Sequence, residues 1–244
     1  MMSLRKRSAE LEIMDDLDCH GEVVDQTLRE LDVINTLLGG NYVTIDGIKE
    51  LISYAEDTFM PAGTGQKELR ARGVSIADFG CGSGDLLKKI VEWGRRRNIK
   101  INASGIDANP HIIKFARQHN PDITFESLNV FENKTTYDII TATLFVHHFD
   151  DDQLVELFKS MNAHSRIGVV INDIHRHFLS YHSIRLLTKI FSKSAMVKFD
   201  APLSVRRAFK KRELIDILKR AGINDYKLKW KWAFRWQLVW HSFS

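Results

Sequence analysis

Three alternating glycines after a short apolar run constrain this chain more than any other feature. Gly80, Gly82 and Gly84 lie in the segment 77–85, ADFGCGSGD, between an apolar run and a helical pattern. Glycine lets the backbone turn sharply and approach a ligand without a Cβ in the way. A helix that follows such a turn points its unpaired N–H groups at the ligand. The segment therefore predicts a ligand-binding turn at the carboxyl end of a parallel sheet.

A second motif follows one strand–helix unit later and indicates the class of ligand. Asp107, in the segment 105–110, ends the next apolar run, where a carboxylate can accept hydrogen bonds from both ribose hydroxyls. A dinucleotide fingerprint needs a small sixth residue, but Asp85 occupies that position and would repel a pyrophosphate. Asp78 and Asp85 instead suit a cofactor that carries an ammonium and a sulfonium.

At these residues the chain resembles the class I S-adenosylmethionine-dependent methyltransferases, and the resemblance covers residues 74–244. It implies an α/β fold with a Rossmann-like, seven-stranded sheet and S-adenosyl-L-methionine as the cofactor. At position 129 the family usually has an aspartate that accepts from the adenine amino group, and an asparagine oxygen can accept there too. The cofactor-binding residues that the resemblance implies are Asp78, Gly80, Cys81, Gly82, Gly84, Asp107, Ala108, Asn129, Val130 and Leu144.

Strand-like and helix-like patterns alternate from residue 74 onward, which is typical of a doubly wound parallel sheet. Two strands at period two are expected near the end of the chain, within 226–240. The other predicted strands span 74–79, 100–107, 123–128, 137–143 and 166–173. The predicted helices of this part span 83–96, 110–119, 151–163 and 211–221.

Two further segments predict helices outside this alternation. Residues 1–62 contain two helical patterns, the second over 44–59, and we expect them to form an N-terminal helical cap. A linker, 60–65, then leads into a methyltransferase domain over 63–244. A helical insert is expected after strand five, over about 177–203. Because both segments are amphipathic, we expect them to meet above the carboxyl edge of the sheet and close an acceptor pocket.

The segment 144–149, LFVHHF, follows strand four and faces the cofactor cleft. It resembles the Leu-His-His segment of small-molecule methyltransferases, including those that act on quinone rings, and not the Asn/Asp-Pro-Pro-Tyr motif of base amino methylation. Methyl transfer from a sulfonium needs an aligned acceptor and a base. His147 and His148 here, and His175 after strand five, are the candidate catalytic bases. The alternative is local packing or helix capping for His147 and His148, and structural hydrogen bonding for His175.

Asp173, His175 and His177 alternate at the end of strand five, where open α/β sheets bind ligands. Such a group could bind a metal, but alternating positions cannot all converge without a bend and no cysteine joins them, so no metal is expected. We expect His177, Phe178 and Tyr181 to contact the substrate, although a helical aromatic stripe can equally be core.

Composition limits the remaining alternatives. The net charge is +4, and three basic runs, 5–7, 95–97 and 210–212, could contact nucleic acid or anionic lipid or could be solvated helix ends. No apolar run is long enough for membrane insertion, and the N-terminus lacks a signal core, so we expect a cytoplasmic enzyme. Its expected partner is a small-molecule acceptor. RNA or protein methylation and a non-catalytic cofactor-binding module remain alternatives.

A narrower likeness concerns the pathway. The segments 172–177 and 202–209, with Tyr181, resemble bacterial methyltransferases of polyketide and aryl-pigment pathways. This likeness favours secondary metabolism. It names neither the acceptor nor the methylated atom, and the sequence does not indicate the oligomeric state.

Overall fold

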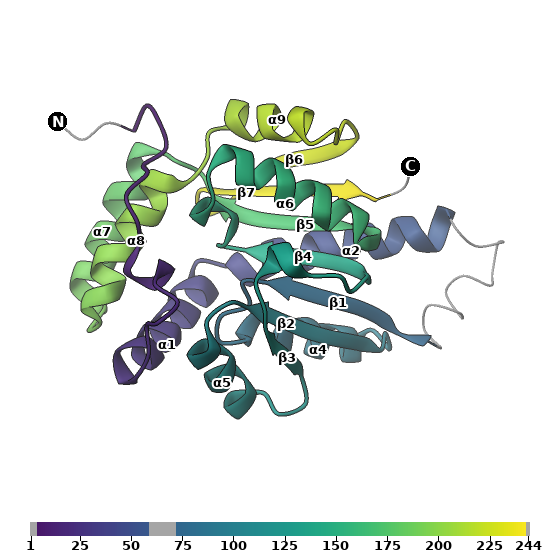
Figure 1. Cartoon of the computed structure of the whole chain (residues 1–244), viewed down its shortest axis with the longest axis horizontal. Helices are drawn as coiled ribbons and strands as arrows, with labels where there is room; N and C mark the ends of the chain where they lie inside the picture. The colour runs from purple at the N-terminus through teal and green to yellow at the C-terminus, as the bar shows by residue number, and fades with distance from the viewer. Residues whose placement is uncertain (1–3, 59–71, 243–244) are drawn as a thin grey trace.

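The computed structural model describes residues 4–58 and 72–242, and these form one mixed sheet with helices on both faces and at one edge (Figure 1). The strand order is β3-β2-β1-β4-β5-β7-β6, with β7 antiparallel to β5 and β6. The predicted Rossmann-like, seven-stranded α/β fold is therefore confirmed. The strands are β1 (Val74–Phe79), β2 (Ile101–Asp107), β3 (Thr124–Ser127), β4 (Tyr137–Thr143), β5 (Ser165–Ile174), β6 (Tyr226–Lys231) and β7 (Arg235–His241).

Helices cover both faces of the sheet because each carries one apolar face. One face packs against α6 (Asp151–Ala163) and α9 (Lys211–Arg220). The other packs against α2 (Gly40–Thr58), α4 (Asp85–Arg96) and α5 (Pro110–His119). In α4, Leu86, Leu87 and Ile90 point into the core at helical spacing. The carboxyl ends of β1, β2, β4 and β5 meet at one edge of the sheet, which these five helices leave uncovered.

The helix α2 lies on the sheet rather than in a separate cap. Ile48 and Leu51 are fully buried in the same core as Ile76 and Val170 of the sheet. A Cβ on Gly47 would lie 2.6 Å from the Cγ1 atom of Val170, so the helix approaches the strands closely. This corrects the expectation of one cap over residues 1–62, because an amphipathic pattern predicts a buried face but not its partner. The expected linker over 60–65 lies outside the described residues.

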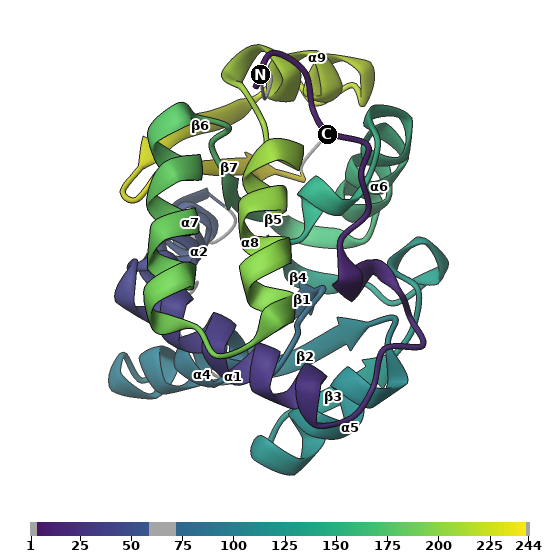
Figure 2. The same ribbon diagram turned by 90° about the vertical axis from the view of Figure 1, so that its left-hand side faces the viewer.

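The cap over the carboxyl edge consists of α1 (Glu22–Leu37), α7 (Phe178–Phe191), α8 (Ala195–Arg207) and the short η1 (Ile13–Asp15). Figure 2 looks onto this edge, with α7 and α8 upright in front and α1 across their lower ends. The insert breaks into two helices at Lys193 and Ser194, whose backbone N–H groups donate to Glu30 of α1 at 3.0 and 3.1 Å. Within the described part of the chain, no helix is long and apolar enough to cross a membrane.

Candidate active site

A cavity of about 830 Å³ lies between the cap and the carboxyl ends of the strands. Ligand sites typically enclose about 300–1,000 Å³. Four loops form its floor: the glycine turn after β1 and the segments that follow β2, β3 and β4. Apolar side chains of the cap form its roof, among them Leu31, Ile34, Leu187, Val197 and Val205. The cavity therefore joins the loops that bind ligands in open α/β sheets to a mostly apolar covering.

The glycine turn needs its glycines for two different reasons. Gly80, Gly82 and Gly84 have φ angles of 69°, 52° and 81°, in the left-handed region that favours glycine. A Cβ on Gly80 would lie 2.0 Å from the Phe145 ring at the cavity wall. A Cβ on Gly84 would lie 2.5 Å from the Phe125 ring in the core, and Gly84 is absent from the cavity wall. Gly80 thus shapes the cavity, whereas Gly84 lets α4 pack on the sheet.

Asp107 connects the two sequence motifs. Its Oδ1 atom accepts a hydrogen bond from the backbone N–H of Asn109 at 3.0 Å, and its Oδ2 atom accepts one from Gly82 at 3.3 Å. Burial raises the pKa of Asp107, and these two hydrogen bonds oppose the rise. Of the predicted cofactor-binding residues, all except Gly84 line this cavity: Asp78, Gly80, Cys81, Gly82, Asp107, Ala108, Asn129, Val130 and Leu144. Asn129 also caps a short helix, because its side chain accepts from the backbone N–H of Phe131.

Two carboxyl groups beside the glycine turn, those of Asp78 and Asp32, form no salt bridge with a described residue, whereas Asp85 pairs with Lys89. Burial raises the pKa of Asp78 to about 8, against the effect of a 2.7 Å hydrogen bond from Thr141. Asp32, on α1, lines the same cavity, accepts a 2.7 Å hydrogen bond from Ser83 and has its pKa raised to about 6 by burial. Neither carboxyl forms a salt bridge with a described residue. This part of the cavity suits a ligand with positive charge. No sequence motif pointed to Asp32.

His147 is buried and held in one tautomer. Its Nδ1 atom lies 2.8 Å from Oδ1 of Asp173, whose Oδ2 atom accepts from the backbone N–H of His147. Burial alone would raise the pKa of Asp173, but the adjacent His147 keeps it below its usual value. Asp173 is therefore a carboxylate that only accepts, so the proton of His147 resides on Nδ1. The Nε2 atom has no hydrogen-bond partner among the described residues and lies 3.6 Å from Oε1 of Glu12.

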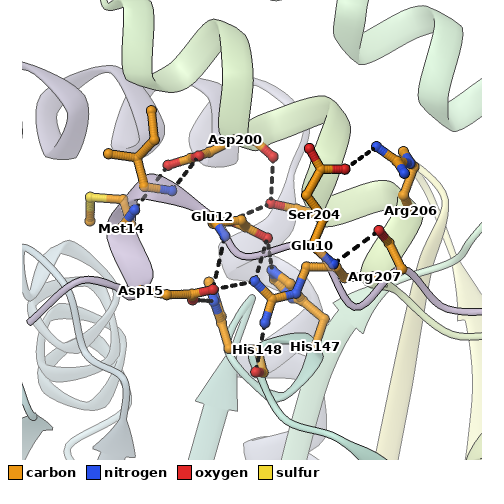
Figure 3. Close-up of polar contacts among 12 residues, drawn as sticks. Glu10, Glu12, Met14, Asp15, His147, His148, Asp200, Ser204, Arg206 and Arg207 are labelled. Atoms are coloured by element: carbon orange, nitrogen blue, oxygen red, sulfur yellow. Dashed lines mark hydrogen bonds and ion pairs between the residues drawn. The ribbon is translucent and has the colours of Figure 1, made fainter.

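The N-terminal segment supplies Glu12 to this site, as Figure 3 shows. Its Oε2 atom accepts a 2.9 Å hydrogen bond from Ser204 of α8, whereas Oε1 has no hydrogen-bond partner in the described chain. Burial raises the pKa of Glu12 to about 7. Arg207 places a guanidinium nitrogen 3.8 Å from Oε1 and donates a 2.6 Å hydrogen bond to the backbone oxygen of His148. No sequence motif pointed to Glu12, because the first residues carry no periodic pattern.

His148 points to a second carboxylate of the same segment. Its Nδ1 atom lies 2.5 Å from Oδ1 of Asp15, which is also paired with Arg207. Burial alone would raise the pKa of Asp15, but His148 and Arg207 hold it well below its usual range. Glu12, His147 and His148 each offer a ligand atom, and these atoms lie within 4.8 Å of one another, so this group could hold a metal ion. The sequence did not predict this group, and the adjacent Arg207 charge opposes a cation there.

The histidines at the end of β5 lie elsewhere. His175 and His177 line a second cavity of about 620 Å³, with Lys210 and Trp236. Beyond Asp173 the chain stays extended, and His175 donates its backbone N–H to the oxygen of Phe234 at 2.8 Å. This path carries His175 past the sheet edge toward α9, which corrects the expectation that it converges with His147 and His148.

The predicted aromatic substrate contacts are also outside the main cavity. Phe178 is 61% exposed, Tyr181 is buried, and neither side chain lines the cavity wall. The periodic pattern of α7 located the helix correctly, but the side chains of α7 that face the cavity are Ser180, Ser183, Ile184 and Leu187. The position of these residues therefore corrects the sequence-based choice of His177, Phe178 and Tyr181.

Comparison with known proteins agrees with this geometry. Residues 76–168 match the model of a family described as a methyltransferase domain. No curated protein matches the chain by sequence. Human N-acetylserotonin methyltransferase, solved with S-adenosylmethionine, superimposes with a TM-score of 0.61 at 16% identity, over 95% of this chain and 59% of that one. The chain thus spans less than two thirds of the human enzyme.

Two further solved structures share the fold. A plantazolicin methyltransferase, solved with S-adenosylhomocysteine and a substrate analogue, has a TM-score of 0.57 at 14% identity, over 84% of this chain and 71% of that one. The CMeT domain of the citrinin polyketide synthase has a TM-score of 0.52 at 13% identity, over 72% of this chain and 49% of that one. The chain thus shares the fold of these solved methyltransferases, and its residues 76–168, which include the glycine turn, match a methyltransferase domain.

Proposed function

We propose that the chain transfers the methyl group of S-adenosylmethionine to a hydroxyl or a ring carbon of a small aromatic, quinonoid or polyketide acceptor. The observation that carries this proposal is the setting of His147. Its Nδ1 atom is fixed by Asp173, its Nε2 atom is free of hydrogen bonds within the described chain, and the ring lines the same cavity as Gly80 and Asp107. The proposed base and the carboxylate expected to bind the nucleoside thus line one cavity.

The residues present fit the cofactor. Asp107 would accept from the ribose hydroxyls, and Ala108 and Val130 would lie beside the adenine. Asp78 and Asp32 form no salt bridge with a described residue, and a bound ammonium or sulfonium would compensate them. When bound, the cofactor supplies a methyl group that is already activated on sulfur. The tasks left to this chain are to bind, to orient the acceptor and to take up a proton.

His147 would take up that proton at Nε2. A phenol has a pKa near ~10 and an imidazole near ~6.5, so the imidazole can accept the proton as the new oxygen–carbon bond forms. Asp173 would stabilise the resulting imidazolium through its 2.8 Å contact with Nδ1. With a ring carbon as acceptor, the same atom would remove the ring proton after the bond has formed.

The covering of the cavity supports an apolar acceptor. Phe145 and Phe149 line the floor beside the two histidines, and the helices of the cap add aliphatic side chains. Solved relatives with TM-scores above 0.5 include enzymes named for N-acetylserotonin and for a polyketide synthase, which supports a small-molecule acceptor. No described feature of the cavity resembles a groove for a nucleic-acid backbone.

Calorimetry with S-adenosylhomocysteine, followed by transfer of a labelled methyl group to a panel of phenols, hydroquinones and polyketide-type rings, tests the proposal. Binding together with methylation of one ring class is the expected result. Methylation of RNA or protein alone would show that the acceptor class is wrong, and no binding would reject the cofactor. We expect activity to survive a chelator. Its loss and recovery with a divalent ion would mean that Glu12, His147 and His148 hold a metal.

Asp107→Ala should weaken binding of S-adenosylhomocysteine by about 1–3 kcal/mol, or about 5- to 150-fold, because hydrogen bonds to a charged group are lost. Isothermal calorimetry measures the change. Asp107→Asn is the matched control, since it keeps the shape and one acceptor oxygen and should lose less. Equal binding by wild type and Asp107→Ala would contradict a ribose contact at this residue.

Cofactor binding should release a proton from Asp78. With a folded-state pKa of about 8, this carboxyl is mostly protonated at pH 7. A bound positive charge favours the carboxylate and lowers the pKa, so a proton leaves and affinity rises as pH increases toward 8. Calorimetry in two buffers of different ionisation enthalpy measures the release. The proton release should vanish in Asp78→Asn, which shows that the proton comes from Asp78 and not from Glu12. Identical heats for wild type in both buffers would argue against a contact between Asp78 and the positive charge of the cofactor.

A further inference from the structure

Arg235, the first residue of β7, is a buried cation that contacts no carboxylate among the described residues. The residue is 4% exposed and lines the main cavity. One guanidinium nitrogen, Nη2, donates a 2.9 Å hydrogen bond to Oδ1 of Asn35. The Nε and Nη1 atoms have no hydrogen-bond partner in the described chain, and Arg235 forms no salt bridge with a described residue. Burial lowers the pKa of Arg235 to about 10, against the opposing charge of Asp173.

Such an arrangement is costly unless a ligand completes it. Arginine is almost never fully buried without a partner, because desolvation of its charge must be compensated. The guanidinium presents its donors as a planar fork that matches a carboxylate with two parallel hydrogen bonds. The free donors Nε and Nη1 point to opposite sides of the guanidinium, so an anion that enters the cavity would bind at one of them, with the second N–H of Nη2 as the other donor of the pair.

The surrounding chain makes room for this group. A Cβ on Gly40 would lie 2.8 Å from Cζ of Arg235 and 1.8 Å from Oδ1 of Asn35, so only glycine admits both side chains. Gly40 also begins α2, a helix of 19 residues. The first N–H groups of this helix, with the positive end of its dipole, favour an anion at the same place.

The position of Arg235 connects both halves of the cavity. Asn35 donates a 2.6 Å hydrogen bond to Asn41, which donates at 3.3 Å to Asp85 beside the glycine turn. On the other side, Asp173 interacts electrostatically with Arg235 and contacts His147 directly. An anion at Arg235 could thus belong to the molecule on the glycine turn or to the molecule beside His147.

We propose that Arg235 anchors a buried carboxylate-binding subsite of the main cavity. The proposal rests on the proposed function, because the carboxylate comes either from the amino-acid end of the cofactor or from the acceptor. In the first case Arg235 fixes the cofactor chain, and in the second it selects acceptors that carry a carboxylate and orients them against His147.

The test compares wild type with Arg235→Gln and Arg235→Lys by calorimetry. One pair of probes is S-adenosylhomocysteine and 5′-deoxy-5′-methylthioadenosine, which lacks the amino-acid end. The other pair is 4-hydroxybenzoate and its neutral amide, added to protein saturated with S-adenosylhomocysteine. Arg220→Gln, which removes an exposed arginine of α9, is the control for a change of net charge.

If the carboxylate belongs to the cofactor, Arg235→Gln should weaken binding of S-adenosylhomocysteine by about 10-fold or more, while the affinity for methylthioadenosine changes less than about twofold. If the carboxylate belongs to the acceptor, nucleoside binding should be unchanged, and the variant should lose about as much affinity for the benzoate but none for its amide. Arg235→Lys should retain part of the affinity in either case. If neither the nucleoside nor the benzoate is weakened by Arg235→Gln, the subsite does not exist.

Thermal unfolding separates this role from a structural one. Removal of an uncompensated buried charge should leave the melting temperature of the ligand-free protein unchanged or higher, while the increase caused by ligand becomes smaller. A lower melting temperature in both variants, with all four probes weakened alike, would assign Arg235 to scaffolding and overturn the proposal. If wild type binds neither nucleoside, the proposed function fails, and the benzoate pair, added to the protein without nucleoside, then decides for or against Arg235.

Discussion

Replacement of His147 by alanine is expected to lower methyl-transfer turnover by about 10²–10⁴-fold, the usual contribution of a general base. The effect should be confined to chemistry, because the ring contacts Asp173 and faces Glu12 rather than the glycine turn. The affinity for S-adenosylhomocysteine should change less than about twofold. Turnover measured on an acceptor found by the labelled-methyl panel, with calorimetry on the same preparation, separates the two quantities.

His175→Ala is the matched control for His147→Ala. It also removes an imidazole, but from the second cavity, so turnover should stay near the wild-type value. Asp173→Asn should reduce turnover too, since an amide no longer fixes the proton on Nδ1. Full activity of His147→Ala would exclude this residue as the base. A loss in His175→Ala as large as that in His147→Ala would show that the histidines converge after all.

The strands were predictable because their signals are local. The first and fourth predicted strands, 74–79 and 137–143, coincide with β1 and β4, since apolar runs there end at turn residues. The assignment of α2 to a cap was not correct, because periodicity shows which side of a helix is buried but not against which element. The same limit applies to α7, where the pattern suggested that Phe178 and Tyr181 face the acceptor.

The proposed cofactor and acceptor halves of the site also differ in how local their sequence signals are. Of the ten residues that the family resemblance implies for the cofactor, seven lie in the motifs 77–85 and 105–110, and six of these seven line the cavity. Their contact with the cofactor stays a prediction. The acceptor half joins Glu12, His147 and Arg207, which come from distant parts of the chain. No spacing rule connects such residues. His175 does not lie beside His147 as expected, because the strand pattern does not indicate that the chain leaves the sheet after Ile174.

Gly80→Ala is expected to destabilise the protein by about 2–5 kcal/mol. A left-handed backbone costs a non-glycine residue about 1–2 kcal/mol, and forced overpacking costs about 1–3 kcal/mol more. Both apply here, because φ is 69° and the added Cβ would lie 2.0 Å from the ring of Phe145. If the ring yields, it moves from its place at the cavity wall, and cofactor affinity should fall instead. Denaturant unfolding and calorimetry with S-adenosylhomocysteine measure the two alternatives.

Gly82→Ala separates the steric effect from the backbone effect. Gly82 also has a positive φ, of 52°, but its added Cβ would meet only Leu28, at an ordinary contact distance of 3.8 Å. The free energy of unfolding of Gly82→Ala should therefore fall only by the cost of the left-handed conformation, about 1–2 kcal/mol. A larger combined loss of stability and affinity in Gly80→Ala than in Gly82→Ala would identify the Phe145 contact as the reason for glycine at position 80. Equal losses would mean that the ring adapts without cost and that only the backbone conformation requires glycine there.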